Sequence, residues 1–218
     1  LLNHYQIYPH KNNKISEISF NKNNRIEIVD KIFSIDPAGC TDIDDAFSII
    51  NKGESTIFKI HISDVYSVLY QNNIIEYVCG YSSIYQSNQT IHMLNNMLSE
   101  NYCSLIEKNI RLMITLEISV NDGKFEYKFY KSYGKITKNY SYDNVPKFIN
   151  KYYVSLTQLY QLITNNQIYI SDSHKFIEAM MIIYNKLFAE HLIKKGKKVI
   201  FRSQIKSNHI PEKLDEQL

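Results

Sequence analysis

The pattern of hydrophobic and polar residues predicts three strands in the first part of the chain. Residues 26–35, 46–50 and 56–62 are apolar and β-branched, in alternating or continuous runs. Such runs are typical of strands that bury one or both faces. The polar, turn-forming residues 51–54 separate the last two runs, so we expect a hairpin there. The polar residues 1–25 are predicted to form a lead-in segment.

A second hairpin is predicted near the middle of the chain. Residues 111–120 and 124–133 alternate strongly between apolar and polar side chains on either side of an Asn-Asp-Gly turn at residues 121–123. That turn sequence is the strongest short-range hairpin signal. Between the two hairpins, residues 64–80 read as a helix or turn that Asp64 could cap at its start.

Two helices are predicted in the last third of the chain. Residues 144–163 are expected to be helical, and residues 173–195 give the clearest helical spacing of apolar side chains. Ser173 could cap the start of this second helix and Gly196 could end it. No internal repeat or low-complexity linker divides the chain. The predicted architecture is therefore one α+β domain.

Composition restricts the class of protein. The 218 residues, 44% of them hydrophobic, suffice for one packed core, and the net charge of +3 permits nucleic-acid binding without arguing for it. Cys40, Cys79 and Cys103 are odd in number and lack metal-site spacing, which argues against disulfides or zinc. No apolar stretch approaches the ~20 residues that span a bilayer. We expect a soluble, intracellular, cytoplasmic protein with no membrane partner.

The most informative segment is an acidic run directly after the first predicted strand. Asp36, Asp42, Asp44 and Asp45 fall within ten residues. Carboxylates this close repel one another, so they need water, partners or a divalent cation. Hard oxygen ligands suit Mg²⁺ or Mn²⁺. In an extended loop Asp42 and Asp44 could point one way and Asp45 another. A solvated acidic turn is the simpler alternative, whereas the glycine and glutamate of a calcium-binding EF-hand loop are missing.

The longer pattern around these aspartates resembles a known family. An Ile-Asp-Pro sequence, followed by aspartates six, eight and nine residues after the first, is similar to the signature of the ribonuclease II and ribonuclease R catalytic domain, the RNB domain. Further similarities follow in the family's order: residues 59–65, Ser83-Ile84-Tyr85, residues 91–94, Cys103-Ser104-Leu105, Arg111-Leu112, residues 176–181, residues 200–202 and residues 211–214.

The resemblance implies a fold and an activity. The expected fold is α+β, with a mixed, mostly antiparallel sheet and packed helices, and residues 26–218 would be the amino-proximal part of an RNB domain within a longer polypeptide. The implied activity is Mg²⁺-dependent hydrolysis of single-stranded RNA from its 3′ end, with release of nucleoside 5′-monophosphates. Cold-shock and S1 modules in the full-length chain and subunits of an RNA-decay complex are the further partners expected.

The resemblance also assigns residues to roles. Asp36, Asp42, Asp44 and Asp45 would bind the metal and act in catalysis, with Asp44 the least dispensable. Three residues would contact RNA: Tyr85, which would stack on the 3′-terminal base, Glu178 and Arg202. His61 and Asp64 are expected to be structural.

Departures from the family pattern keep an alternative open. Gln86-Ser87 replace the usual Leu-Pro after Tyr85, Ala179 replaces the second of two paired glutamates, and the stretch from Leu159 to Ser173 is shorter than its family counterpart. A catalytically degenerate RNB-like protein that binds RNA or acts as a scaffold would tolerate these changes. Lysines at 194, 195, 197 and 198 could contact phosphates or simply complement a helix C-terminus.

Overall fold

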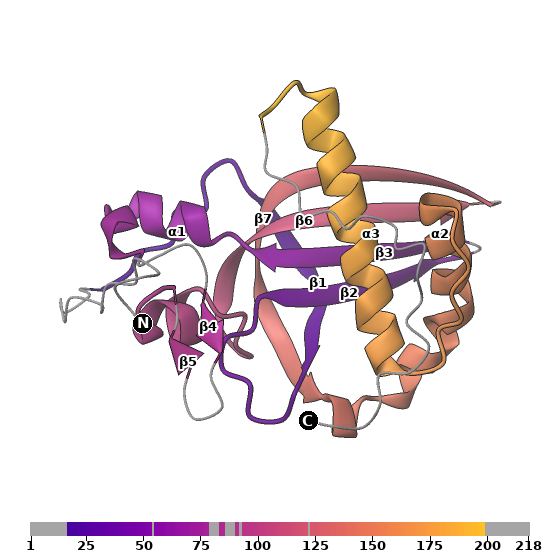
Figure 1. Ribbon diagram of the computed structural model, residues 1–218, viewed down its shortest axis with the longest axis horizontal. Coiled ribbons are helices and arrows are strands. Elements are labelled where there is room, and N and C mark those ends of the chain that lie inside the picture. The colour runs from indigo at the N-terminus through magenta and orange to yellow at the C-terminus, as the bar shows by residue number, and fades with distance from the viewer. Residues whose placement is uncertain are drawn as a thin grey trace, which may run out of the picture.

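A closed barrel of five strands forms the centre of the protein, as a computed structural model shows (Figure 1). The structure describes residues 17–53, 55–78, 83–85, 90–91, 93–121 and 123–198. Around the barrel the strands follow one another in the order β1 (Ile26–Asp36), β2 (Asp45–Lys52), β3 (Ser55–Ser63), β6 (Ile110–Asn121) and β7 (Lys124–Ser141).

The barrel combines four antiparallel pairs with one parallel pair. Both predicted hairpins are present: Lys52 pairs with Ser55, and Asn121 with Lys124. Gly53 has a φ of 63° and Gly123 a φ of 72°, values that glycine adopts without steric cost. The parallel pair of β1 and β7 closes the barrel. This confirms the prediction of a mixed, mostly antiparallel sheet with packed helices.

Two helices cover the outer face of the barrel (Figure 1). Residues of α2 (Tyr153–Thr164) and α3 (Ser173–Lys194) bury their apolar sides against outward-facing side chains of the strands, including Phe47, Phe58 and Leu116. A shorter helix, α1 (Val65–Gln71), and the two-stranded sheet of β4 (Ile84–Tyr85) and β5 (Thr90–Ile91) lie at the other side. Short helical turns are η2 (Ile75–Tyr77), η3 (Leu98–Tyr102), η4 (Tyr142–Asn144) and η5 (Lys147–Tyr152).

Two details of the predicted helices were wrong. The cap of α3 is Asp172, whose carboxylate accepts a 2.9 Å hydrogen bond from the Lys175 amide, and not Ser173. The helix expected over residues 144–163 is regular only from Tyr153 onward. Pro146 restricts the residue before it to extended conformations, so the chain forms the turns η4 and η5 before α2 begins. Within the described residues, none of the helices has both the length and the hydrophobicity needed to cross a lipid bilayer.

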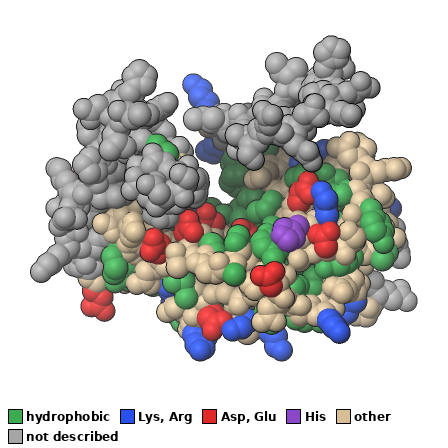
Figure 2. Space-filling model, turned by 60° about the horizontal axis from the view of Figure 1, so that its bottom comes forward, with side chains coloured by type: hydrophobic (Ala, Val, Ile, Leu, Met, Phe, Trp, Pro, Cys, Tyr) green, Lys and Arg blue, Asp and Glu red, His purple; other side chains and the backbone are tan. Residues whose placement is uncertain are grey.

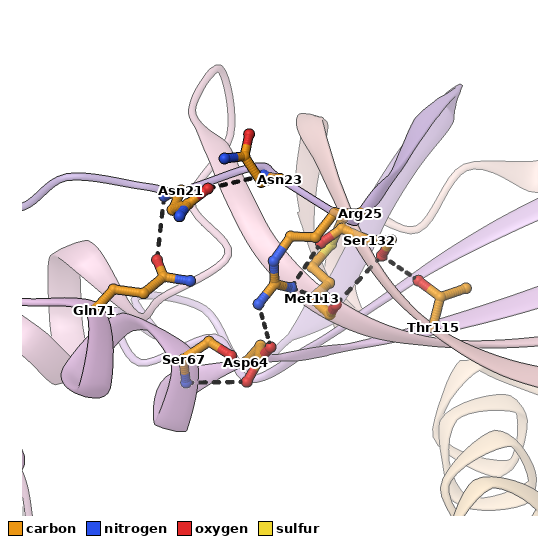
Figure 3. A network of polar contacts seen from close by, with 9 residues as sticks. All are labelled: Asn21, Asn23, Arg25, Asp64, Ser67, Gln71, Met113, Thr115 and Ser132. Carbon is orange, nitrogen blue, oxygen red and sulfur yellow. Dashed lines mark hydrogen bonds and ion pairs between the residues drawn. The ribbon is translucent and has the colours of Figure 1, made fainter.

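The described end of the lead-in segment is attached to the barrel by a buried ion pair (Figure 3). Arg25 Nη2 lies 2.6 Å from Asp64 Oδ2, and both side chains are buried. Asp64 also caps α1, as predicted, by accepting a hydrogen bond from the Ser67 amide. Burial alone would raise the pKa of Asp64, but these hydrogen bonds and the Arg25 charge outweigh it and hold the pKa below its usual value. Asp64 therefore has a structural role.

A buried histidine occupies the inside of the barrel. His61 Nε2 lies 3.0 Å from Ser48 Oγ, and His61 Nδ1 lies 2.8 Å from Thr115 Oγ1. Thr115 in turn shares a 2.6 Å hydrogen bond with Ser132. Burial, reinforced by the nearby Lys59 charge, lowers the pKa of His61 to about 3. The imidazole is therefore neutral at physiological pH and acts as part of the core, as expected from the sequence.

Replacing His61 with Gln should change how stability depends on pH. In the unfolded chain His61 protonates near its usual pKa of about 6.5, whereas in the folded protein it resists protonation down to about pH 3. The free energy of unfolding should therefore decrease as pH falls from 6.5, by up to roughly 4 kcal/mol at pH 3. The free energy of unfolding of His61→Gln should decrease less as pH falls, because the variant has no imidazole to protonate. Urea unfolding of both proteins at pH 7 and pH 4.5 measures the difference, and equal pH dependence would contradict it.

Candidate functional site

The four predicted site aspartates lie together at one end of the barrel. Asp36 is the last residue of β1 and Asp45 the first of β2, and these strands are antiparallel neighbours. Asp42 and Asp44 lie in the loop between them, residues 37–44, at the lower end of the barrel in Figure 1. Figure 2 shows acidic side chains gathered on this end, beside a hollow with hydrophobic walls. The fold thus assembles the acidic run into one site.

Ile43 determines how the loop presents its carboxylates. The Ile43 side chain is buried against Leu105 and Met113 inside the barrel. Asp42 is half-buried and Asp44 is exposed, so neither side chain is part of this core. The backbone is held there by neighbouring segments: the Leu105 amide donates to Ile43 O at 2.8 Å, and the Ser63 amide donates to Asp44 O at 2.9 Å.

Burial and the neighbouring negative charges raise the pKa values of Asp36, Asp44 and Asp45. For Asp45, burial and the charges of Asp36 and Asp44 raise the pKa to about 7. Asp44 is an exposed residue, but crowding around its carboxylate and the charges of Asp42 and Asp36 raise its pKa as well. Burial, and the Asp42 charge to a lesser extent, raise the pKa of Asp36 against the effect of a hydrogen bond from Ser34. The site therefore favours anything that supplies positive charge.

Two carboxylate oxygens at this site lack hydrogen-bond partners. They are Asp36 Oδ2 and Asp45 Oδ2, and no other buried side-chain nitrogen or oxygen atom of the described residues is in this state. An unsatisfied buried acceptor costs about 1–3 kcal/mol, more when it is charged. A cation or a donor from a ligand would remove that cost. Within the described ranges, however, no three His, Cys, Asp or Glu side chains converge as a preformed metal cluster.

The donor set suits a hard divalent cation. Carboxylate oxygens, some of them unsatisfied, are the ligands that Mg²⁺ and Mn²⁺ prefer, and Mg²⁺ keeps several waters and needs only a few protein ligands. The nearby Cys40 thiol is a soft ligand that Mg²⁺ and Mn²⁺ do not favour, and burial and the charges of Asp36 and Asp42 raise its pKa to about 11. A pocket of about 370 Å³ lies beside the loop, between Asp36, Cys40 and the end of β7 at Lys138–Ser141.

The sequence did not predict an aromatic pair that lies near the aspartates. The rings of Tyr142 and His174 stack with centroids 3.9 Å apart and planes at 7°. Burial raises the pKa of Tyr142, and the charges of Asp36 and Asp45 add to the effect, so its hydroxyl lies within electrostatic reach of the site. The pair joins the end of β7 to the start of α3. No local sequence signal indicates such a contact, because 31 residues separate its members along the chain.

The other predicted RNA-binding residues lie on segments outside the acidic loop, and the side chains of two of them are not described. The backbone of Tyr85 pairs with Thr90 in the small sheet, but its side chain lies outside the described part. Arg202 also falls outside the described residues. Glu178 is exposed on α3 and forms a 2.6 Å ion pair with Lys175. The lysines that begin at Lys194 follow the far end of α3, about 30 Å from its start.

The sequence matches the RNB domain family over residues 25–162. Among curated relatives, ribonuclease R of Ureaplasma parvum is 38% identical over 133 residues, which cover 57% of this chain and 18% of that protein. Ribonuclease R of Chlamydia muridarum is 26% identical over 214 residues, covering 78% of this chain and 30% of that protein. The chain thus spans less than a third of the length of these relatives.

Solved structures show the same fold. Mycoplasma genitalium RNase R in complex with ribose-methylated single-stranded RNA superposes with a TM-score of 0.69 at 22% identity, covering 89% of this chain and 39% of that one. The complex of the same enzyme with double-stranded RNA superposes with a TM-score of 0.70 at 21% identity, covering 90% of this chain and 44% of that one. The family match covers well over half of the chain. This chain belongs to the RNB domain family.

Proposed function

We propose that the protein is a Mg²⁺-dependent exoribonuclease that hydrolyses single-stranded RNA from its 3′ end and releases nucleoside 5′-monophosphates. The observation that carries the proposal is the pair of buried, unsatisfied carboxylate oxygens on Asp36 and Asp45, which flank the loop that carries Asp42 and Asp44. The family supports the reaction class, since its curated relatives are named ribonuclease R. Mn²⁺ would serve the same ligands.

The aspartates would hold the metal at the end of the barrel. Asp36 and Asp45 are fixed by β1 and β2, so they form the rigid side of the site, and Asp42 and Asp44 approach from the loop. When bound, Mg²⁺ supplies an activated water and stabilises the negative charge that develops on the phosphate oxygens. Protons would compete little with the metal for the Asp45 carboxylate above pH 7, because burial and the charges of Asp36 and Asp44 raise its pKa only to about 7.

A metal titration tests this assignment without any RNA. Mn²⁺ binding, measured by electron paramagnetic resonance and by calorimetry, should be seen in the wild type and should be displaced by Mg²⁺. Asp36→Asn should weaken it at least tenfold. Glu126→Gln removes an exposed carboxylate near the β6–β7 hairpin and is the matched control. Equal binding by wild type and Asp36→Asn would exclude Asp36 as a ligand of the metal.

Tyr85→Ala should alter how the protein holds the RNA end. By family resemblance this tyrosine stacks on the terminal base, and a base on an aromatic face contributes about 1–3 kcal/mol without reading the sequence. The variant should therefore change the length of the final product and weaken binding of short oligonucleotides, with its Mg²⁺ dependence unchanged. If the product ladder and the oligonucleotide affinities are identical to those of the wild type, Tyr85 does not stack on the RNA and serves only in packing.

A further inference from the structure

A buried serine lies directly behind the acidic loop. Ser104 is fully buried, in the segment between η3 and β6. Its hydroxyl makes two hydrogen bonds, and neither is to its own segment. Oγ donates to the Thr41 carbonyl at 2.7 Å and accepts from the Ile43 amide at 2.9 Å. Ser104 thus contacts the backbone on both sides of Asp42.

These two bonds fix the conformation of the segment that carries Asp42 and Asp44. The Ser104 hydroxyl uses its single donor and one acceptor site on the loop, so its orientation is determined. Together with the bonds to Ile43 O from the Leu105 amide and to Asp44 O from the Ser63 amide, four contacts hold residues 41–44. A four-residue stretch with this many backbone restraints has little freedom to reorient its carboxylates.

Ser104 is itself held by a buried arginine. The Arg111 guanidinium donates from Nε to Ser104 O at 2.7 Å and from Nη2 to Asn101 O at 3.0 Å. Arg111 lies at the start of β6, and its guanidinium also rests over the Phe20 ring at 5.7 Å. The planar guanidinium suits this task because its donors have a fixed geometry. The loop is therefore connected to the barrel wall through Ser104 and Arg111.

Most buried serines are simply satisfied hydroxyls of the core, and Ser132 is an example. Its hydroxyl is also fully buried, but it bonds to Thr115 within the barrel wall. Ser104 differs because both partners belong to the loop that carries two of the four aspartates. Loss of its hydroxyl would leave the Ile43 amide and the Thr41 carbonyl without these partners, and the loop would have to move to satisfy them.

We propose that Ser104, held by Arg111, is a positioning residue that fixes the Thr41–Asp44 backbone so that Asp42 and Asp44 present their carboxylates to the divalent cation. The inference rests on the proposed function, since it concerns the same metal site. Outer contacts that orient metal ligands typically change metal affinity or activity by 10–100-fold when they are removed. Ser104→Ala should have an effect of this size, although Ser104 does not touch the metal or the RNA.

The test compares Ser104→Ala, Ser104→Thr and the control Ser132→Ala in the natural protein that contains this chain. Ser104→Ala should raise the Mg²⁺ concentration for half-maximal RNA hydrolysis and weaken Mn²⁺ binding, each by about 10–100-fold. Ser104→Thr keeps the hydroxyl, so its Mg²⁺ requirement and its Mn²⁺ affinity should lie close to the wild-type values. Ser132→Ala loses a comparable buried hydroxyl and should leave both at wild-type values. A purely structural role would instead give the two alanine variants similar losses of stability and unchanged metal affinity.

Hydrogen exchange adds a measurement that does not depend on any variant. The Ile43 amide of the wild type should exchange at least about tenfold more slowly than an unprotected amide, and Mg²⁺ should slow it further. An unprotected Ile43 amide overturns the proposal even if Ser104→Ala fails to fold. Wild-type metal affinity and rate in a folded Ser104→Ala also overturn it, while the proposed function stands. A wild type without Mg²⁺-dependent binding or hydrolysis overturns both.

Discussion

Asp44→Asn is expected to lower RNA hydrolysis by on the order of 10³-fold while RNA binding and the fold persist. The amide retains the size of the side chain but removes the negative charge that would hold the metal and its water. Asp44 is exposed and its side chain is not needed for packing, so stability should not decrease. Single-turnover hydrolysis of a labelled single-stranded RNA, with affinity from fluorescence anisotropy, separates the two effects.

Glu126→Gln provides the control for this experiment. It removes the same charge from an exposed position on β7, far along the strand from the acidic loop, and should hydrolyse RNA at the wild-type rate. If Asp44→Asn also hydrolyses RNA at that rate, the assignment of the loop to catalysis is wrong. If the variant loses RNA binding and rate together, Asp44 contributes to holding the substrate and not to the chemistry.

Asp45→Asn is expected to stabilise the metal-free protein at pH 8 by roughly 2–4 kcal/mol. Folding raises the pKa of Asp45 to about 7, because it buries the carboxylate beside Asp36 and Asp44. The unfolded chain releases this proton near the usual pKa of 3.8. The Asp45 contribution to stability is therefore unfavourable above pH 7 and disappears as pH falls from 7 to 4. Asn carries no charge and should show no such dependence.

The measurement is the difference in the free energy of unfolding between Asp45→Asn and the wild type from pH 8 to pH 4.5, in a chelating buffer. The difference should be largest at pH 8 and should shrink as pH falls. Taking the difference removes the opposite contribution of His61, whose pKa is lowered and which destabilises the fold below pH 6.5. Mg²⁺ at 100 times its dissociation constant should stabilise the wild type by ~2.7 kcal/mol and the variant much less. A difference that stays constant with pH would contradict the pKa assignment.

The strands and hairpins could be predicted from the sequence because their signals are local. Alternation of apolar residues identified β1, β2, β3, β6 and the first half of β7, and the Gly53 and Gly123 turns explained their connections. Barrel closure could not be predicted this way. It depends on the parallel pairing of Ile26 with Ser132 and of Asp36 with Ser141, contacts that are more than 100 residues apart. Sequence periodicity carries no information on such pairing.

The candidate site, too, could be predicted only where its residues are close in sequence. Its four aspartates were found because they lie within one short run of a recognisable pattern, and the two strands that flank the run place them together. The supporting parts were not found, because they come from other segments of the chain. Ser104 reaches the loop from 61 residues away, and the stack of Tyr142 on His174 joins a strand end to a helix start. Only the folded structure brings such residues into contact.

The most direct test of the central proposal is the product of RNA hydrolysis by the natural protein that contains this chain. A 5′-labelled single-stranded RNA should shorten stepwise from its 3′ end in Mg²⁺, with nucleoside 5′-monophosphates as the released product. Chelation of the metal should stop the reaction, and metal return should restore it. RNA that is bound but never shortened, at any concentration of Mg²⁺ or Mn²⁺, would contradict the account and would identify the protein as an RNA-binding member of the family without catalysis.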